Sequence, residues 1–215
     1  MSLVREMRKV YRKIADRSIL QRIGSYEQID GWLEKSEAAA LCRLASRVSA
    51  GAGGANILEI GCWKGKSTYC LASGLREGRV YVIDPFDAAG EVESRDIYAK
   101  QKGQRPLVEE FKENMQSRGV LGKIEILQGY SQAFVGKVPE LDLLFIDGDH
   151  SQEGCAFDFE NFSPLVKSGG YLLFHDFDAK RPEVGPTWVV QNKVIPSGKF
   201  SFYGLYHRLW VARRK

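Results

Sequence analysis

Short apolar runs rich in β-branched residues alternate with helical segments over most of this chain, and that alternation constrains the fold more than any other feature. Five such runs cover residues 56–60, 80–83, 123–127, 141–146 and 171–174. A strand that is apolar throughout is buried on both faces, as in a parallel sheet that helices cover on each side. The sequence therefore predicts an α/β domain with a doubly wound, mostly parallel sheet.

Helical patterns lie between the strands and before them. Between the strands they cover residues 67–75, 107–118, 131–138 and 153–166. At the start, residues 3–23 show a helical period with apolar side chains at Val4, Met7, Tyr11 and Ile14, which leaves the basic residues on the other face. A second helix is expected over residues 38–48, with Ser36 as its cap.

Two final runs, residues 200–206 and 208–212, predict a closing antiparallel pair joined through His207. This pair brings the expected sheet to seven strands, with an antiparallel C-terminal strand. No repeat or long linker divides the chain. We therefore expect an N-terminal basic, amphipathic helical extension over residues 1–30 and a single domain over residues 31–215.

The basic residues gather at the N-terminal end. The whole chain has a formal net charge of +4, but residues 1–22 hold seven Lys or Arg against Glu6 and Asp16, a local net of +5. The other 193 residues therefore carry −1. A nearly neutral body lacks the basic face that a phosphate backbone requires, so no nucleic-acid partner is expected. The basic helix is a candidate contact for a homo-oligomer.

The cysteines and the hydropathy pattern bear on the compartment. Cys42, Cys62, Cys70 and Cys155 show no C-x-x-C spacing and stand in or beside apolar or glycine-rich stretches, which is typical of free, buried thiols in a reducing compartment. No apolar run approaches the ~18 residues of a membrane span, and no cleavable leader pattern follows the basic start. We expect a cytoplasmic protein without a transmembrane segment.

A glycine loop follows the first predicted strand, in the segment E-I-G-C-W-K-G-K-S of residues 59–67. Gly61 and Gly65 permit close backbone approach to a ligand, and the following helix presents free N–H groups to an anion. A P-loop needs four residues between its glycines and this loop has three, while Trp63 replaces the second glycine of a dinucleotide site. The sequence therefore disfavours both a P-loop and a dinucleotide site here, but it excludes neither.

A nucleoside that ends in a single carboxylate suits this loop better. S-adenosylmethionine is such a ligand, since its amino-acid end is smaller than a pyrophosphate and does not need the second glycine. Asp84 ends the next strand, where a carboxylate can accept hydrogen bonds from two ribose hydroxyls. The alternative for Asp84 is a turn residue before Pro85.

Four motifs in this order resemble class I S-adenosylmethionine-dependent O-methyltransferases. They are the glycine loop, the acid of V-I-D-P, the turn G-Y-S-Q at residues 129–132, and F-I-D-G-D-H at residues 145–150. The sequence is most similar to the family of macrocin-type sugar O-methyltransferases and cephalosporin-hydroxylase-like proteins (methyltransferase domain 24 type), with catechol O-methyltransferase as a distant relative. The resemblance covers residue 32 to the C-terminus and implies a Rossmann-like fold.

The resemblance also implies which residues contact the cofactor. The methionine end would meet Glu59, Gly61 and Ser67 in the loop that Gly65 closes, the ribose would meet Asp84, and the adenine would meet Ser131 and Gln132. Trp63 would stand near the transferring methyl group, where an indole face stabilises a sulfonium. A plain core position for Trp63 is an equal alternative.

Polar residues follow two later strands. Asp147, Asp149 and His150 come after one strand, and His175 and Asp176 come after the next. Both groups should emerge at the carboxyl edge of the sheet beside the glycine loop, where so many titratable groups are costly unless water, a ligand or a metal satisfies them. The pattern therefore favours a catalytic site over a solvated loop.

In the resembled family a metal is held by an acid at the position of Asp147 and by an adjacent acidic pair after the next strand, and His150 stands where the general base is expected. This chain has His175-Asp176 in place of two acids. The imidazole of His175 either points away from the metal, supports the metal ligands without binding the ion, or selects a softer ion than Mg²⁺, such as Mn, Fe or Zn. A divalent metal on Asp147, His175 and Asp176 is one alternative. A metal-free site with His150 or His175 as base is the other.

The remaining polar residues receive plainer interpretations. Asp149 is expected to cap the helix that begins near Gln152, Asp158 is expected to face solvent, and His207 is assigned no role. Residues 86–105 form a long polar connection that is a candidate lid.

Taken together, the sequence predicts a methyltransferase that uses S-adenosylmethionine on a hydroxyl of a small acceptor such as a sugar, a phenol or another natural product. A cofactor-binding module without catalysis and a P-loop nucleotide hydrolase are the alternatives.

Overall fold

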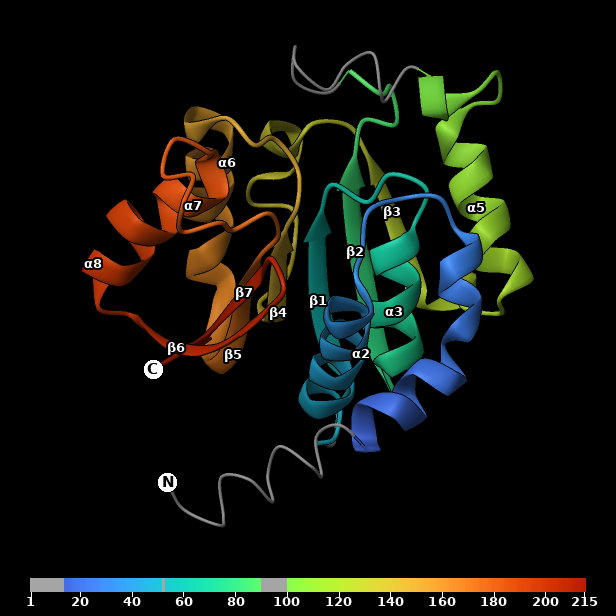
Figure 1. Cartoon of the computed structure of the whole chain (residues 1–215), viewed down its shortest axis with the longest axis horizontal. Coiled ribbons are helices and arrows are strands. Elements are labelled where there is room, and N and C mark those ends of the chain that lie inside the picture. Colours follow the sequence, from blue (N-terminus) through green and yellow to red (C-terminus); the bar gives the residue numbers. More distant parts are fainter. Residues whose placement is uncertain (1–13, 52, 90–99) are drawn as a thin grey trace.

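Seven strands form one twisted sheet in the part of the chain that the computed structural model describes, residues 14–51, 53–89 and 100–215 (Figure 1). The strands are β1 (Ala55–Ile60), β2 (Gly78–Asp84), β3 (Ile124–Gln128), β4 (Leu141–Ile146), β5 (Val166–Phe174), β6 (Phe200–Tyr206) and β7 (Leu209–Arg214). Their order is β3-β2-β1-β4-β5-β7-β6. The first five are parallel, and β7 pairs antiparallel with both β5 and β6. The predicted fold class is confirmed.

The strand order reverses between β1 and β4, which are hydrogen-bonded neighbours although two strands separate them along the chain. The chain winds outward from β1 through β2 to β3 and then crosses back to β4. Ligands of open α/β sheets bind at such a switch point, outside the carboxyl ends of the strands. The loops after β1 and β4 therefore occupy the position at which a site is expected.

Helices cover both faces of the sheet (Figure 1). One face packs against α2 (Lys35–Val48), α3 (Lys66–Gly74) and α5 (Leu107–Ser117), and the other against α6 (Gln152–Phe162), α7 (Gly185–Val189) and the helical turns that follow it. Successive side chains of a strand point to opposite faces. In β4, accordingly, Leu143 and Phe145 belong to the first core and Leu144 and Ile146 to the second.

Three predicted helices differ from the observed ones. The helix expected over residues 131–138 is wrong, because only a 3-10 turn, η3 (Ser131–Phe134), forms there, before Gly136 with φ 75° and the following proline. The helix expected to end at residue 166 stops at Phe162, and Pro164 follows in a 3-10 turn. Helix α2 begins at Lys35 rather than after Ser36, since Glu34 and Glu37 form a capping box.

The N-terminal segment is only partly described. Residues 14–22 are helical, and η1 (Gly24–Gln28) follows. Val4, Met7 and Tyr11 of the predicted apolar stripe lie outside the described residues, and Ile14, its last member, is 62% exposed rather than packed. In contrast, Ile23, Tyr26 and Ile29 are buried in the core on the α2 side. The division of the chain at residue 30 stays a prediction.

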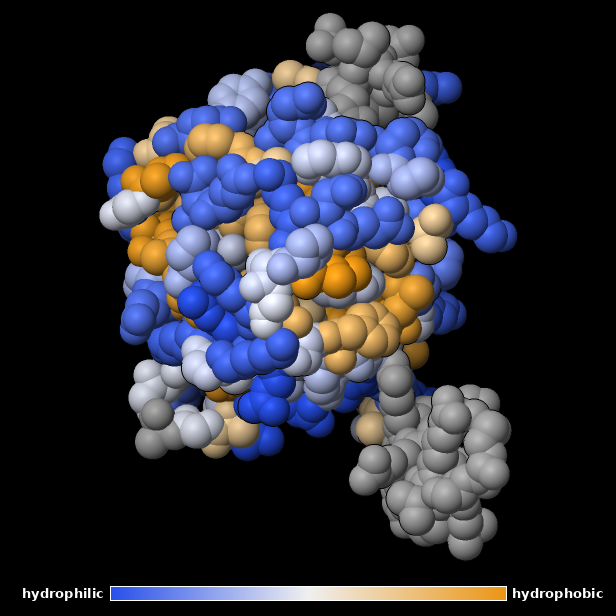
Figure 2. Space-filling model, turned by 90° about the vertical axis from the view of Figure 1, so that its left-hand side faces the viewer, coloured by the Kyte–Doolittle hydropathy of each residue, from blue (hydrophilic) through white to orange (hydrophobic). Residues whose placement is uncertain are grey.

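The face at the left of Figure 1 carries exposed apolar side chains on its outer elements. Figure 2 shows this face, with hydrophobic residues in orange among hydrophilic ones in blue. The exposed apolar side chains of the outer elements include Ile195 at the start of α8 (Ile195–Ser197) and Phe202 and Leu205 of β6. Strand β6 is one of the two edges of the sheet, and its register with β7 shifts between Phe202 and Gly204. An irregular edge of this kind disfavours continued pairing with another strand.

All four cysteines are free and buried, as the sequence indicated. Among the described helices, none combines the length and the apolar character that crossing a bilayer requires.

Candidate active site

A cavity of about 840 Å³ opens at the carboxyl ends of the parallel strands. Its walls come from the loops after β1, β2, β3, β4 and β5, together with the segment 30–34, one residue of α2 and the turn between β6 and β7. The volume lies in the range of small-molecule sites. Every predicted catalytic and metal-binding residue lines this cavity, and so does every predicted cofactor-binding residue except Glu59 and Gly65.

The two glycines of the loop after β1 are required by packing within the protein. Gly61 has φ 83°, and a Cβ there would lie 2.2 Å from the carbonyl oxygen of Asp147. Gly65 has φ 91° and precedes α3, and a Cβ there would meet Met115 at 2.7 Å and Phe111 at 2.9 Å. The sequence analysis attributed both glycines to close approach of a ligand. The structure adds a cause within the fold, since the loop lies against the β4 loop on one side and α5 on the other.

Glu59 lies beneath the loop rather than in the cavity wall. Its side chain is fully buried and accepts hydrogen bonds from the hydroxyls of Ser67 and Thr68 at the start of α3. Burial raises the pKa of Glu59 to about 8, although the two hydroxyls oppose the shift. In the described structure Glu59 thus holds α3 against β1, while Ser67 lines the cavity. The expected contact between Glu59 and the cofactor stays a prediction.

The P-loop alternative is disfavoured by what its key residues contact. Lys66 donates from Nζ to the carbonyl of Gly31 at 2.9 Å, and Ser67 donates its hydroxyl to Glu59. In a P-loop this lysine reaches the phosphates and this hydroxyl binds Mg²⁺. Both groups are engaged within the protein here, so the G-K-S ending does not form a nucleotide site.

Asp84 ties β2 to the glycine loop and also lines the cavity. Its Oδ2 accepts hydrogen bonds from the backbone N–H of Cys62 at 2.8 Å and of Trp63 at 2.9 Å, and its Oδ1 accepts from Phe86 at 2.7 Å. Burial raises its pKa against the effect of these three donors. A carboxylate offers about four acceptor positions, so the three bonds leave room for a ligand hydroxyl. The turn interpretation and the ribose interpretation of Asp84 are therefore compatible.

Trp63 is both a core residue and a wall residue. It has a positive φ of 49°, packs against the core on the α2 side, and lines the cavity beside Trp32, with 6.2 Å between ring centroids. The next residue, Lys64, is only 4% exposed and pairs with Asp30 at 3.0 Å and Glu110 at 2.9 Å. The ion pairs fix the loop on α5 and on the segment before α2. Neither of the two interpretations of Trp63 excludes the other.

The far end of the cavity contains Ser131, Gln132 and Asp158. Asp158 was expected to face solvent, but it is 3% exposed. Burial raises the pKa of Asp158 to about 6, although a hydrogen bond with Ser131 acts to lower it. The reason is its place on α6, where Cys155, Asp158, Phe159 and Phe162 form the buried stripe. Helical spacing from those apolar neighbours was the signal in the sequence that identifies Asp158 as inward-facing.

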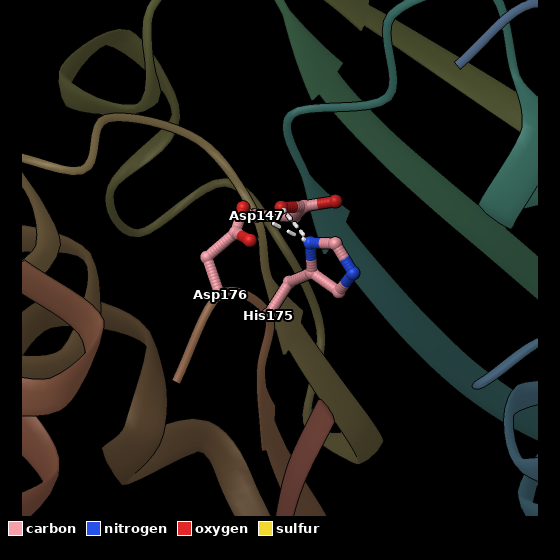
Figure 3. Close-up of side chains that lie close together, drawn as sticks. All are labelled: Asp147, His175 and Asp176. Atoms are coloured by element: carbon pink, nitrogen blue, oxygen red, sulfur yellow. Dashed lines mark hydrogen bonds and ion pairs between the residues drawn. The ribbon is translucent and has the colours of Figure 1, made fainter. Parts of the chain in front are cut away.

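Acidic and imidazole side chains meet at the ends of β4 and β5. Figure 3 shows the carboxylates of Asp147 and Asp176 both next to Nδ1 of the His175 ring, which lies 3.1 Å from Asp147 Oδ1 and 3.2 Å from Asp176 Oδ2. His150 Nε2 lies 3.7 Å from Asp147 Oδ1 and 3.6 Å from Asp176 Oδ2. These four residues and Glu37 are called the acid–imidazole cluster below. The sequence-based prediction of one shared edge is confirmed.

Glu37 of α2 is the member that sequence reasoning missed. It is 1% exposed, and its Oε2 lies 3.4 Å from His175 Nε2. The Glu37 carboxylate also accepts hydrogen bonds from the backbone N–H of Glu34 at 2.7 Å and from that of Arg208 at 2.9 Å. Glu37 stands in an alanine-rich helix 110 residues before Asp147, so only the packing of α2 on the sheet brings it here. The interaction with His175 and the two N–H groups lower the pKa of Glu37 against the effect of burial.

His175 is held on every side. Burial would lower its pKa, but the carboxylates of Asp147, Asp176 and Glu37 outweigh burial and raise the pKa well above the ordinary value. The pKa of Asp176 is lowered to about 2, although burial alone would raise it. The His175 imidazole contributes more to this lowering than the guanidinium of Arg208, which lies 3.6 Å from Asp176 Oδ1. The ring also packs edge-on against Phe145. The three carboxylates around the ring therefore favour the charged form of His175 over the neutral one.

Two further residues of this region differ from expectation. Asp149 does not cap α6, because its Oδ1 accepts the N–H of Ser151 at 2.8 Å and Ser151 itself caps the helix through the N–H of Gly154. His207, which was assigned no role, lines the cavity in the β6–β7 turn and lies 3.5 Å from Glu37. Nothing in the sequence near His207 and Arg208 indicates that this turn reaches the cavity.

The donor set of Asp147, His175 and Asp176 fits a divalent metal. One ligand atom from each residue lies within 4.8 Å of the others. Ligands at about 2.1 Å in octahedral geometry lie about 3 Å apart, close to the two spacings from His175 Nδ1. Two carboxylates and an imidazole suit Mn²⁺, Fe²⁺ or Zn²⁺ better than an all-oxygen set would. The same residues can therefore hold either a proton or a metal at Nδ1.

Residues 58–177 match a family model described as a methyltransferase domain. Among curated proteins, an uncharacterized protein of Acanthamoeba polyphaga mimivirus is 28% identical in an alignment of 158 positions that covers 68% of this chain. The chain spans 63% of the length of that relative. The matched segment runs from β1 to just after β5 and thus includes the glycine loop, Asp84 and most of the acid–imidazole cluster.

Solved structures with the same fold include the O-methyltransferase NovP, the O-methyltransferase TomG, which is involved in tomaymycin synthesis, and the methyltransferase MycE of the mycinamycin biosynthetic pathway. NovP has a TM-score of 0.68 at 15% identity, with 96% of this chain and 99% of that chain covered. TomG from Streptomyces achromogenes, in complex with S-adenosylmethionine, has a TM-score of 0.62 at 17% identity, with 94% of this chain and 89% of that chain covered. MycE, in complex with Mg, S-adenosylhomocysteine and mycinamycin VI, has a TM-score of 0.58 at 13% identity, with 93% of this chain and 53% of that chain covered. At these identities the likeness shows the fold.

Proposed function

The chain belongs to the methyltransferase-domain family, and from that premise we propose that it transfers the methyl group of S-adenosylmethionine to a hydroxyl oxygen of a small acceptor. The observation that carries the proposal is that one cavity holds both the glycine loop with Asp84 and the acid–imidazole cluster. A cofactor-binding module has no use for two imidazoles and three carboxylates at the cavity wall. A sugar, a phenol or a related natural product is the proposed acceptor class.

The cofactor is proposed to lie along the loops after β1, β2 and β3. Its methionine end would meet Gly61 and Ser67, its ribose would meet Asp84, and its adenine would meet Ser131 and Gln132. All five residues line the cavity in this order around the switch point of the sheet. Trp63, between the loop and Trp32, would then face the sulfonium, which an indole ring stabilises by a cation–π interaction.

Methyl transfer is an in-line displacement. The acceptor oxygen forms a bond to the methyl carbon, the carbon–sulfur bond breaks, and S-adenosylhomocysteine leaves with the electron pair of that bond. The hydroxyl proton must go to a base, and His150 is the proposed base, because it lies at the cavity wall and its Nε2 is farther from the carboxylates than His175 Nδ1 is. His175, enclosed by three carboxylates, is poorly suited to accept a proton.

A divalent metal, if bound, would be held by Asp147, His175 and Asp176, and it would supply a lower pKa for the acceptor hydroxyl. The contribution of this chain's own residues is separate from that chemistry. Glu37 Oε2 lies 3.4 Å from Nε2 of His175, while Nδ1 faces Asp147 and Asp176. The backbone N–H of Arg208 fixes Glu37 in turn. The site therefore has a preset orientation for its imidazole.

Titration calorimetry with S-adenosylhomocysteine tests the cofactor half of the proposal. The wild type should bind one equivalent at micromolar affinity, and Asp84→Ala should bind roughly tenfold more weakly or worse, since it loses a charge-assisted hydrogen bond to the ribose and the anchor of the loop. Glu125→Ala, which removes an exposed carboxylate from β3 outside the cavity, is the matched control. Absence of binding to the folded wild type, or equal affinity in both variants, would overturn the proposal.

A further inference from the structure

A second cavity lies at the opposite end of the molecule from the acid–imidazole cluster. Its volume is about 530 Å³, and its walls come from helical residues 18–22, the second half of α2 and the turn after α3. These elements meet near the amino ends of the parallel strands, at the bottom of Figure 1. The two cavities share no lining residue. The second cavity therefore serves neither the cofactor nor the acceptor.

The lining of this cavity is strongly basic. Four of its eight residues are arginines, Arg22, Arg43, Arg47 and Arg76, and two more are the serines Ser18 and Ser46. None of the eight is acidic. We call these four side chains the arginine cluster. Four guanidinium groups around one space repel each other unless an anion lies between them.

The described residues supply only one carboxylate to the arginine cluster, since Asp16 pairs with Arg43. No described carboxylate forms an ion pair with Arg22, Arg47 or Arg76. Arg22 donates instead to the thiol of Cys42 at 3.1 Å, which is a weak acceptor, and Arg47 donates to the hydroxyl of Tyr203. The Nη2 atom of Arg43 is buried without a hydrogen-bond partner. With respect to the residues that the structure describes, the cluster thus has unused donors and an uncompensated positive charge.

Contacts with aromatic rings hold two of these arginines in place. The Arg43 guanidinium lies over the ring of Tyr206 at 5.3 Å and that of Arg47 over the ring of Tyr203 at 5.7 Å. Stacked guanidinium groups lose less freedom when they bind than free surface side chains do. The cluster comes from three separate elements, so its geometry belongs to the fold and not to one basic helix face.

We propose that the arginine cluster binds a small phosphorylated anion. Guanidinium groups match phosphate oxygens with paired, charge-assisted hydrogen bonds, and the serine hydroxyls add neutral donors. The cavity is much larger than one phosphate group, so a ligand with two phosphoryl groups fits it better than orthophosphate does. The phosphoryl group can come from a free metabolite or from a lipid headgroup, and the test separates these sources.

Inorganic pyrophosphate in metal-free buffer is the probe for a free anion. Calorimetry at constant ionic strength should show one equivalent bound, and thermal denaturation should show a melting temperature that rises with pyrophosphate concentration. Arg22→Gln and Arg76→Gln should each weaken binding roughly tenfold. Arg79→Gln is the matched control, since Arg79 is exposed, lies three residues from Arg76 and does not line the cavity. Its affinity should stay within about twofold of the wild type.

Sedimentation with phosphatidylglycerol vesicles, against phosphatidylcholine vesicles, is the second arm. Vesicle binding that Arg76→Gln weakens and Arg79→Gln does not would assign the anion to a lipid headgroup, and pyrophosphate binding with the same pattern would assign it to a free ligand. No binding in either arm, or binding that the Arg22→Gln/Arg76→Gln double variant retains, would overturn the proposal. Affinity for S-adenosylhomocysteine should be unchanged in these variants, and this value verifies that they are folded.

Discussion

At the scale of single residues, Glu37 and His175 show how burial and charge act together in this site. His175 is 6% exposed and faces three carboxylates, and Glu37 is 1% exposed and faces an imidazole and two backbone N–H groups. Each group would be costly to bury alone. Together they form a closed set in which every charge has a partner, and that set fixes which ring nitrogen of His175 faces the cavity.

The first residue-scale prediction concerns Glu37. Glu37→Leu should lower kcat for methyl transfer roughly tenfold to a hundredfold, because His175 loses the acceptor that orients it. Glu37→Gln, whose amide oxygen can still accept from Nε2, should recover most of that loss. The affinity for S-adenosylhomocysteine should stay constant in both variants. A loss of affinity equal to the loss of kcat would instead indicate a general structural effect.

The second residue-scale prediction concerns pH and Glu59. The pKa of Glu59 is raised to about 8 in the folded protein, above its ordinary value of 4.5. Between these two values the folded chain keeps a proton that the unfolded chain has released, so stability is greatest at low pH and falls as pH rises through this window.

Denaturant titrations at pH 5.5 and 7.5 measure the effect. The wild type should lose roughly 1 kcal/mol per pH unit relative to Glu59→Gln, which does not ionise. The amide oxygen of this variant can still accept from one of the hydroxyls of Ser67 and Thr68, and its NH2 group can donate to the other. Comparison with this variant cancels the contributions of the other titrating groups. Parallel pH profiles for the two proteins would show that Glu59 does not titrate in this range.

At the scale of elements, the loops after β1 and β4 depend on each other. The backbone of Gly61 contacts the backbone of Asp147 so closely that no side chain fits between them, and the N–H of Asp147 donates to the carbonyl of Ile60 at 2.9 Å. The loop that is proposed to hold the cofactor is therefore packed directly on the loop that carries the first acid of the cluster.

The element-scale prediction uses this contact. Gly61→Ala should destabilise the protein by roughly 3 kcal/mol or more, because the added Cβ would require both a left-handed alanine and a displaced β4 loop. Gly24→Ala is the matched control, since a Cβ at Gly24 meets nothing within 4 Å. Chemical denaturation measures both. Equal stability of the two variants would contradict the close packing of the loops.

Much of the element pattern could be predicted from sequence, for a physical reason. Strands such as β1 and β4 are mostly apolar and lie between helices, so local pattern and tertiary burial agree. The helix expected over residues 131–138 failed because Gly136 and Pro139 outweighed its periodicity. The cap of α2 was misplaced because Ser36 resembles a cap, whereas Glu34 and Glu37 form the reciprocal pair.

The site could be predicted only where it follows strand ends. Asp84, Asp147, His150, His175 and Asp176 all stand just after apolar runs, and parallel strands bring such positions together. Glu37, His207 and Arg208 reach the cavity through packing between distant segments, which no local pattern records. Asp158 was misjudged for a different reason, since its charge was given more weight than its helical spacing from Cys155 and Phe162.

At the scale of the whole molecule, the two ends of the sheet carry different chemistry. The carboxyl end holds the acidic site that the family match covers in large part, and segments outside that match, residues 30–37 and 207–208, complete its wall. The amino end holds the arginine cluster. The basic character assigned by sequence to residues 1–22 continues there into the folded body, through Arg22 and the arginines of α2.

The central claim is that one cavity brings the methyl donor to the acid–imidazole cluster, and a methyl-transfer assay tests it most directly. Labelled S-adenosylmethionine is incubated with the enzyme and a panel of hydroxylated sugars and phenols, and mass spectrometry locates the transferred methyl group. We predict an O-methyl product, with kcat at least roughly a hundredfold lower in His150→Ala and an unchanged affinity for S-adenosylhomocysteine. Transfer at the wild-type rate by His150→Ala, or a methyl group found on nitrogen or carbon, would contradict the account.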